Sequence, residues 1–365
     1  MKVDVSQLNE GSILMEDVVL STKRPLAHKK TIINLQHIEA FKAFLIDSVE
    51  VEPTVMDVDI VSSKDAIEEK ENSNSKINEN IQQEINDFYS LYVKAVNSYK
   101  QLYIAWQSGM TIEISKIRDL VLPLVKALLN NKEEILKISH YTKTEEYYFY
   151  HPISVSLLSA YLADSLNMSE GEINQISITG LLADCGMSKI DQSILKKNNP
   201  LTEQDFREMK QHPAHSYNMI KNIPSLKEAV KIGVLQHHER IDGSGYPMSL
   251  SGSKLHLYGK IVAIADTFQA MVCDRPYRRK QSPFKVLEQM IEDDFGKFDI
   301  MVLDELKKII AKLSVGTKVR LSNNQIGEIV FTEEQYPTRP MLRIINTNEF
   351  IALKEKRDLY IEELV

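Results

Sequence analysis

The hydrophobic pattern of the first 52 residues differs from that of the rest of the chain. Residues 1–52 alternate apolar and polar positions around Val3 and Val5, and continue with a strand-like run over 13–20 and a helix-like stretch over 36–45. A period of two predicts half-buried strands, and a period of three to four predicts helix. We therefore predict a small α+β accessory module over residues 1–52.

A polar segment, 53–80, follows this module. It has almost no apolar content and is typical of a linker or of the start of a solvated helix. From Ile81 apolar residues return at helical spacing, and a second helical run over 112–138 contains Pro123, which should kink or split it. We expect residues 81–140 to form a helical connector, in which the apolar stripes serve either core packing or a homodimer seam.

The remaining chain divides into a long helical part and a short strand-rich part. Residues 141–315 show helical periodicity almost throughout, with Ser169 and Thr202 at expected helix N-caps. Over residues 316–365, four short apolar runs, 319–321, 326–331, 341–345 and 351–353, are separated by Asn- and Pro-containing turns and predict the strands of a small β module. The predicted fold class is mainly α, a helical bundle flanked by a small α+β module and a small β module.

Composition and charge limit the binding partners and the cellular compartment that we expect for the protein. The chain has 365 residues and a formal net charge of -7, which argues against binding to a nucleic acid polymer but allows a local basic pocket. Cys185 and Cys273 form no CxxC pair, and no apolar run approaches the roughly 20 residues that span a bilayer. The N-terminus lacks a signal-peptide core. We expect a reduced cytoplasmic protein without a membrane span.

Potential metal ligands recur at helical positions within residues 141–315. His237 and His238 end an apolar helical run, directly before a Gly-rich turn. Asp184 and Asp266 stand in apolar helices, where an unpaired carboxylate would be costly. Imidazole and carboxylate together suit Fe, Mn or Zn, and a shared carboxylate can bridge two metals. We expect helices packed around one axis to aim six side chains inward: His151, Asp184, His212, His237, His238 and Asp266.

The sequence around these six residues resembles the HD-GYP domain, a subgroup of the HD metal-dependent phosphohydrolases. The matching text is Tyr-His-Pro at 150–152, Leu-Leu-Ala-Asp at 181–184, Met-Lys-Gln-His-Pro at 209–213, Gln-His-His-Glu-Arg-Ile-Asp-Gly-Ser-Gly-Tyr-Pro at 236–247, Ile-Ala-Asp at 264–266 and Asp-Arg-Pro-Tyr-Arg at 274–278. Order and gaps agree from about 145 to 312, roughly half the chain.

The resemblance implies a phosphodiesterase that hydrolyses cyclic di-GMP, or a related cyclic dinucleotide, to pGpG and GMP. Hydroxide on a metal held by Asp184 would attack phosphorus, with Fe or Mn as the expected metal. Tyr246, Arg275 and Arg278 would meet the base and the phosphates of the substrate, because arginine forks suit bidentate phosphate contacts.

Two departures from the family pattern bear on activity. Ala183 stands where the family has the histidine of its His-Asp pair, and Met187 stands where it usually has a lysine that approaches the substrate phosphate. The resemblance implies one half-site of Asp184 with His212, His237 and His238, and a second of His151, Asp184 and Asp266 that lacks one imidazole. We therefore expect one firmly bound metal and a second that is weak or absent. The alternative function is a catalytically impaired module that binds the nucleotide or a protein signalling partner.

Overall fold

The computed structural model of the chain divides into two compact units, Met1–Ser75 and Lys76–Val365. Each unit is described by itself. The structure describes residues 2–5, 12–19, 25–27, 29–31, 33, 37–38, 41, 46, 48–51, 68–195, 197, 201–274, 279–292, 295–333 and 335–365, with side chains of the first long helix described from residue 88 onward.

Two short antiparallel strand pairs form the described part of the first unit. β1 (Lys2–Asp4) pairs with β4 (Ser48–Glu50), and β2 (Val18–Val19) pairs with β3 (Pro25–Ala27). The unit has its own small core, made of Val5, Leu14, Ile33, Ile38, Phe41, Val49 and Val51. The strands expected at both ends of this module are present, whereas most of the helix-like stretch over 36–45 lies outside the described residues.

The long helix α2 (Glu68–Gln107) begins inside the polar segment and continues through the first apolar stripe. Phe88, Tyr92 and Trp106 from this stripe are almost fully buried. The hydroxyl of Tyr92 hydrogen-bonds the Oγ of Ser154 across 2.9 Å. The described part of the stripe is therefore core of this chain, and a dimer seam would have to use other residues.

The second helical run is interrupted at a different place from the one expected. α3 (Ile114–Asn130) continues through Pro123, and the break comes before α4 (Glu134–Tyr141). A proline inside a helix removes one hydrogen bond and crowds the preceding turn. Here the buried apolar face of α3 offsets that cost, with Ile114, Ile117, Val121, Leu124, Val125 and Leu128 packed into the core.

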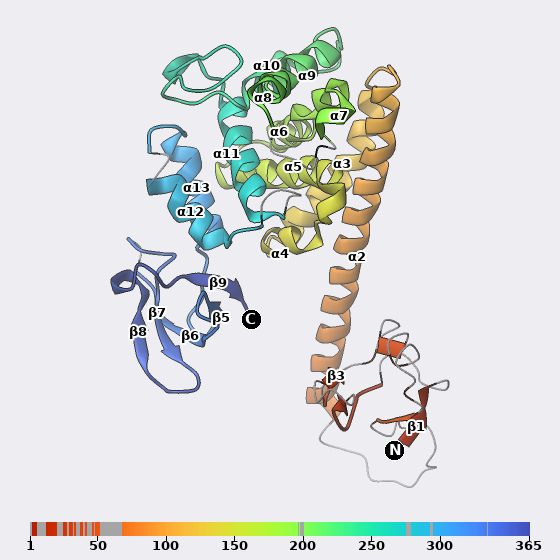
Figure 1. Ribbon diagram of the computed structural model, residues 1–365, viewed down its shortest axis with the longest axis vertical. Coiled ribbons are helices and arrows are strands. Elements are labelled where there is room, and N and C mark those ends of the chain that lie inside the picture. The colour runs from red at the N-terminus through yellow and green to blue at the C-terminus, as the bar shows by residue number, and fades with distance from the viewer. Residues whose placement is uncertain are drawn as a thin grey trace. The chain divides into compact units, whose positions relative to one another are not determined.

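A helical bundle forms the middle of the second unit (Figure 1). Its central helix, α5 (Tyr147–Ser165), is buried on every side, which is typical of a helix inside a core. The expected N-caps are confirmed: Ser169 precedes α6 with a capping box, and Thr202 precedes α8 with another. The helices that follow α5 in the chain are α6 (Glu170–Ala183), α7 (Gln192–Leu195), α8 (Glu203–Met209), α9 (His212–Ile220), α10 (Glu228–Gln236) and α11 (Leu257–Val272). Of these, α6 and α11 pack directly against α5.

A glycine lets α5 and α6 approach closely. A Cβ at Gly180 would lie 3.0 Å from the Cα of Ser156, so a larger residue would push the helices apart. The hydroxyl of Ser156 donates to the carbonyl of Ser177 at 2.7 Å, which ties the helices together. The end of α6 is thereby held beside the first turns of α5, where His151 lies.

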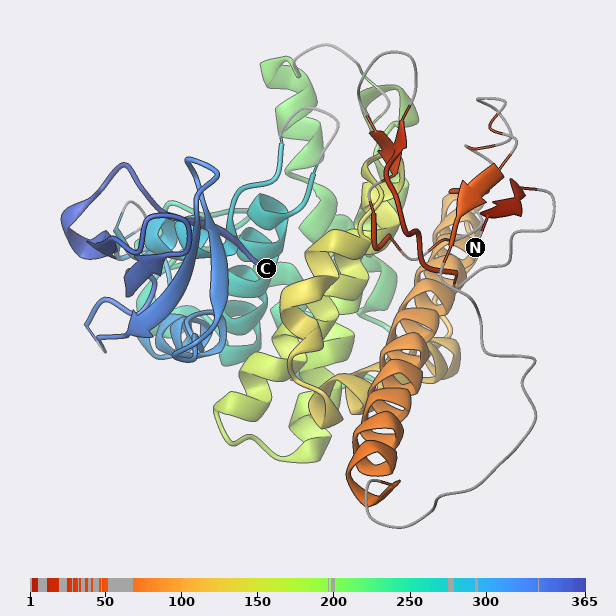
Figure 2. The ribbon, with the colours of Figure 1, turned by 90° about the horizontal axis from the view of Figure 1, so that it is seen from below.

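The chain ends in a five-stranded antiparallel sheet that follows α12 (Pro283–Glu292) and α13 (Ile300–Ile310). The strand order is β8-β7-β6-β5-β9. Figure 2 shows this sheet and α2 on opposite sides of the helical bundle. The strands are β5 (Lys318–Leu321), β6 (Ile326–Phe331), β7 (Met341–Ile344), β8 (Phe350–Ala352) and β9 (Ile361–Leu364). The first four were expected, and the sequence pattern gave no signal for β9.

The sheet is joined to the bundle by one core and by a buried ion pair. A single hydrophobic cluster extends from Phe88 to Ile361. At its edge, Arg339 places Nε 2.9 Å and a terminal guanidinium nitrogen 2.6 Å from the two carboxylate oxygens of Glu288 on α12. Thr338 donates to the same carboxylate at 2.7 Å. No described helix is long and apolar enough to cross a membrane.

We expect Glu288→Gln to loosen the β module. The substitution removes the carboxylate charge that faces Arg339 at less than one-fifth exposure, which should cost about 2 kcal/mol of unfolding free energy. The matched control is Glu305→Gln, whose partner Lys308 is 69% exposed, and it should lower the unfolding free energy clearly less, because solvent screens an exposed pair. Calorimetry of the full chain measures both, and equal losses in the two variants would contradict this account.

Candidate metal centre

Five helices bring the six expected ligand residues to one place. His151 lies in the first turns of α5, and Asp184 is the C-cap of α6. His212 is the first residue of α9, and His237 and His238 directly follow α10. Asp266 lies within α11. Their side chains form two groups with atoms close enough to share an ion each: Asp184 with His212, His237 and His238, and His151 with Asp184 and Asp266.

A tight turn fixes Asp184 against the start of α9. The turn after Asp184, Cys185–Lys189, passes so close that a Cβ at Gly186 would lie 2.2 Å from the carbonyl oxygen of His212. The amide of Gly186 donates to the Oγ of Ser216 at 2.7 Å, and that hydroxyl donates to the carbonyl of Ala183 at 2.7 Å. Only glycine fits this contact, so the turn aligns the carboxylate with the histidine.

Hydrogen bonds to the backbone determine which ring nitrogens face the first group. The Nδ1 of His212 lies 2.7 Å from the carbonyl of Met209, and the Nδ1 of His237 lies 2.7 Å from that of Val234. A carbonyl oxygen can only accept, so each Nδ1 carries a proton and each neutral ring presents a lone pair at Nε2. Backbone carbonyls commonly orient metal-ligating histidines in this way.

The free nitrogens converge with a carboxylate oxygen. The two Nε2 atoms of His212 and His237 lie 3.1 Å apart. The Oδ1 of Asp184 is 3.1 Å from the first and 3.6 Å from the second. Three electron-rich atoms in so small a space repel one another unless a cation lies between them. The donor set of this group therefore fits a divalent transition metal.

The second group has fewer donors, and no backbone hydrogen bond from the described part of the chain orients its histidine ring. The Nε2 of His151 lies 2.8 Å from Oδ1 of Asp266 and 3.6 Å from Oδ2 of Asp184. Its Nδ1 is buried and has no hydrogen-bond partner among the described residues, so no backbone carbonyl sets the ring. The ring is instead stacked on Tyr147, with centroids 4.9 Å apart.

Electrostatics in the buried centre favour charged carboxylates and a neutral imidazole. Burial would raise the pKa of Asp184, but contacts with His212 and His237 leave this pKa well below its usual value. Asp266 behaves alike: burial opposes ionisation, and contacts with His151 and His238 keep its pKa low. Burial, together with the adjacent His237, lowers the pKa of His238 well below 6.5. These are the protonation states that metal ligation requires.

Glu239, which the sequence analysis did not single out, shapes the loop over the centre. It is 2% exposed, and its carboxylate accepts hydrogen bonds from the amides of Met248 at 2.7 Å and Leu250 at 2.9 Å. Gly245 passes directly over its backbone. The available signal was an acidic residue between the histidine pair and a Gly-rich loop whose amides need acceptors.

This loop places Tyr246 at the metal centre. Its ring stacks on that of His238, with centroids 4.7 Å apart, and meets the ring of His212 edge-on at 6.4 Å. Tyr246 therefore lies beside the candidate metal centre, and its contact with a substrate stays a prediction. The other two expected substrate contacts, Arg275 and Arg278, lie outside the described residues.

The segment that carries these residues is similar in sequence to known proteins. Residues 123–302 match the model of the HD domain family. This segment is an HD domain. Part of the chain is 27% identical, over 250 residues, to a cyclic di-GMP phosphodiesterase of Pseudomonas aeruginosa, covering 68% of this chain and 60% of that protein. Another part is 32% identical, over 160 residues, to a 3'3'-cGAMP-specific phosphodiesterase of Vibrio cholerae, covering 44% of this chain and 37% of that protein.

A solved structure shares the fold. The chain aligns with the HDG"Y"P protein Bd1817 from Bdellovibrio bacteriovorus at a TM-score of 0.52 and 15% identity, covering 85% of this chain and 98% of that one. The likeness extends beyond the HD domain. The curated relatives are matched over only part of their length, 60% and 37% for the two named above.

The residues that depart from the HD-GYP pattern are buried or turned away. Ala183, the last residue of α6, is 2% exposed and offers only a methyl group. Met187 is 6% exposed and uncharged. Lys189, the next lysine along the chain, donates to the carbonyl of Trp106 on α2. Neither Met187 nor Lys189 supplies the positive charge that the family lysine would.

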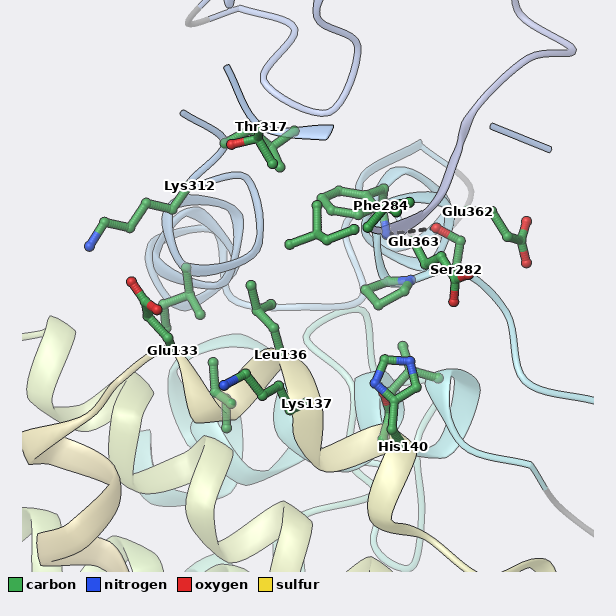
Figure 3. Close-up of a pocket in the computed structure, with 18 of the residues that line it drawn as sticks. Glu133, Leu136, Lys137, His140, Ser282, Phe284, Lys312, Thr317, Glu362 and Glu363 are labelled. Atoms are coloured by element: carbon green, nitrogen blue, oxygen red, sulfur yellow. Dashed lines mark hydrogen bonds between the residues drawn. The ribbon is translucent and has the colours of Figure 1, made fainter. Parts of the chain in front are cut away.

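Two other histidines and Cys185 belong to neither group of potential ligands. His256 caps α11, where its Nδ1 accepts from the amide of Tyr258 at 3.1 Å. Cys185 is fully buried, which raises the pKa of its thiol to about 12. His140 lines a separate cavity of about 590 Å³ between α4, residues 280–284, the end of α13 and β9 (Figure 3). None of the six candidate ligands lines that cavity, so chemistry rather than cavity volume identifies the centre.

The histidine environment predicts acid destabilisation of the metal-free protein. The pKa of His238 is lower in the folded state than in the unfolded state, so the unfolded chain binds the proton more readily and stability falls as pH drops below about 6.5. Thermal unfolding between pH 7.5 and 5.5, after chelation, measures the effect. His238→Asn should show a smaller fall than the unchanged protein, and an identical pH profile would contradict the assignment.

Proposed function

We propose that this protein is a metal-dependent phosphodiesterase of the HD-GYP type that hydrolyses cyclic di-GMP or a related cyclic dinucleotide. The observation that carries the proposal is the convergence of Asp184 Oδ1 with the Nε2 atoms of His212 and His237 in a buried centre. The named activities of the Pseudomonas and Vibrio relatives support a cyclic dinucleotide as substrate.

The residues of the chain would divide the work as follows. Asp184, His212, His237 and His238 would hold one divalent metal, with Fe or Mn as our proposal. When bound, such a metal lowers the pKa of water and polarises a phosphate oxygen. Asp184 is the proposed catalytic residue, because one of its oxygens faces His212 and the other faces His151. Tyr246 would border the substrate, and Arg275 and Arg278 remain proposed phosphate contacts.

A second candidate function has its own support. Ala183 cannot ligate, Met187 is uncharged, and Lys189 is turned toward α2. These features favour a module that binds the nucleotide, or a protein partner, without turnover.

The two buried free cysteines fit a reducing compartment, so we propose a cytoplasmic protein. The first unit would receive a signal or a partner, and a homodimer is a further proposal.

We expect the chain to produce pGpG from cyclic di-GMP, and Asp184→Asn to reduce the rate at least about a hundredfold, because the carboxylate serves both groups. Anaerobically purified protein supplied with Fe or Mn is assayed by chromatography. Asp119→Asn, an exposed aspartate on α3, is the matched control and should keep its activity. Absence of product from the unchanged protein, with the dinucleotide still bound, would establish the second candidate function.

Metal content tests the depleted second group. We expect about one metal per chain by elemental analysis, because the second group lacks an imidazole. Ala183→His should raise the content toward two, and its combination with Met187→Lys should raise turnover by restoring a charge beside the phosphate. Two metals per chain in the unchanged protein, or no gain in the double variant, would contradict the expected cost of these losses.

A further inference from the structure

A cationic and aromatic face on α8 lies next to the candidate metal centre. Phe206 is 55% exposed. Lys210 follows the last turn of α8, with Nζ 5.5 Å from the centre of the Phe206 ring. Together with Arg207, which lies 4.0 Å from the carboxylate of Glu203, these side chains and Glu203 line a hollow of about 390 Å³. We call Phe206, Arg207 and Lys210 the α8 face.

Ring contacts connect this face to the metal centre without interruption. The ring of His238 stacks on Tyr246 with centroids 4.7 Å apart, and the Nζ of Lys210 lies 5.3 Å from the centre of the Tyr246 ring. Lys210 is therefore placed between Tyr246 and Phe206. A molecule bound at the metal and extending past Tyr246 would meet Lys210 first and Phe206 next.

The charge of Lys210 is not used within the described part of the chain. Lys197, close by, is paired with Asp205 on α8, whereas no carboxylate pairs with Lys210 among the described residues. The chain is acidic overall, so a free cation over two aromatic rings is suited to an anionic ligand. The contacts with the two rings also restrain the ammonium group near Tyr246.

We propose that the α8 face is a subsite for the second nucleotide of a cyclic dinucleotide, an inference that rests on the proposed function. Such a substrate carries two phosphates and two bases, and only one phosphate reacts at the metal. Lys210 binds the other phosphate as a point charge, and Phe206 stacks on its base.

Equilibrium binding to the metal-loaded full chain tests the subsite. The ligands are a hydrolysis-resistant phosphorothioate analogue of cyclic di-GMP, and GMP, which has no second nucleotide. Lys210→Met and Phe206→Ala should each lower the affinity for the analogue by about tenfold and leave the affinity for GMP unchanged. The matched controls, Lys221→Met at the end of α9 and Phe331→Ala, 53% exposed on β6, should change neither affinity.

The outcomes separate this inference from the function on which it rests. If the unchanged protein binds the analogue and Lys210→Met binds it equally well, the subsite is wrong and the proposed function stands. An equal loss of GMP and analogue affinity in Lys210→Met would place the lysine at the reacting phosphate and would also overturn the subsite. If the unchanged protein binds neither ligand, the proposed function fails and the subsite fails with it.

Discussion

The candidate metal centre depends on the contacts that the Asp184 carboxylate makes with the surrounding histidines. Its Oδ1 faces His212 and His237, and its Oδ2 faces His151, so one residue joins the two groups of potential ligands. A charged carboxylate in a buried place is costly unless it has cationic or hydrogen-bonding partners. The surrounding imidazoles satisfy that need and hold the pKa of the carboxylate well below its usual value.

Several contacts elsewhere in the scaffold position this carboxylate and its neighbours without supplying ligand atoms. Gly180 brings α5 and α6 together, and Gly186 lets the turn after α6 reach the start of α9. Glu239 closes the loop that carries Tyr246 over the histidine pair. Each contact fixes backbone where a small displacement would separate the ligand atoms, and accurate positioning is what metal sites require of the residues behind the ligands.

The two groups of potential ligands differ in donor number and in how their histidine rings are oriented, and this difference bears on the function. The first keeps four donors, with two rings oriented by backbone carbonyls, whereas the second has three donors and one ring without such a bond. In our proposal the first group binds the metal that faces the phosphate, and the missing imidazole weakens the two-metal arrangement that stabilises both the attacking and the leaving oxygen. The proposed subsite on the α8 face would contribute to substrate binding without taking part in turnover.

The sequence by itself determined the helical class, the C-terminal strands as far as β8, the N-caps at Ser169 and Thr202, and the six side chains of the centre. These features follow from local periodicity and from polar residues whose burial needs a partner. The tertiary structure decided the rest. It continued α3 through Pro123, paired β9 with β5, and turned Lys189 toward Trp106. It also revealed Glu239 and the α8 face, because a buried acceptor and an exposed ring beside a distant loop depend on contacts between segments that no local pattern encodes.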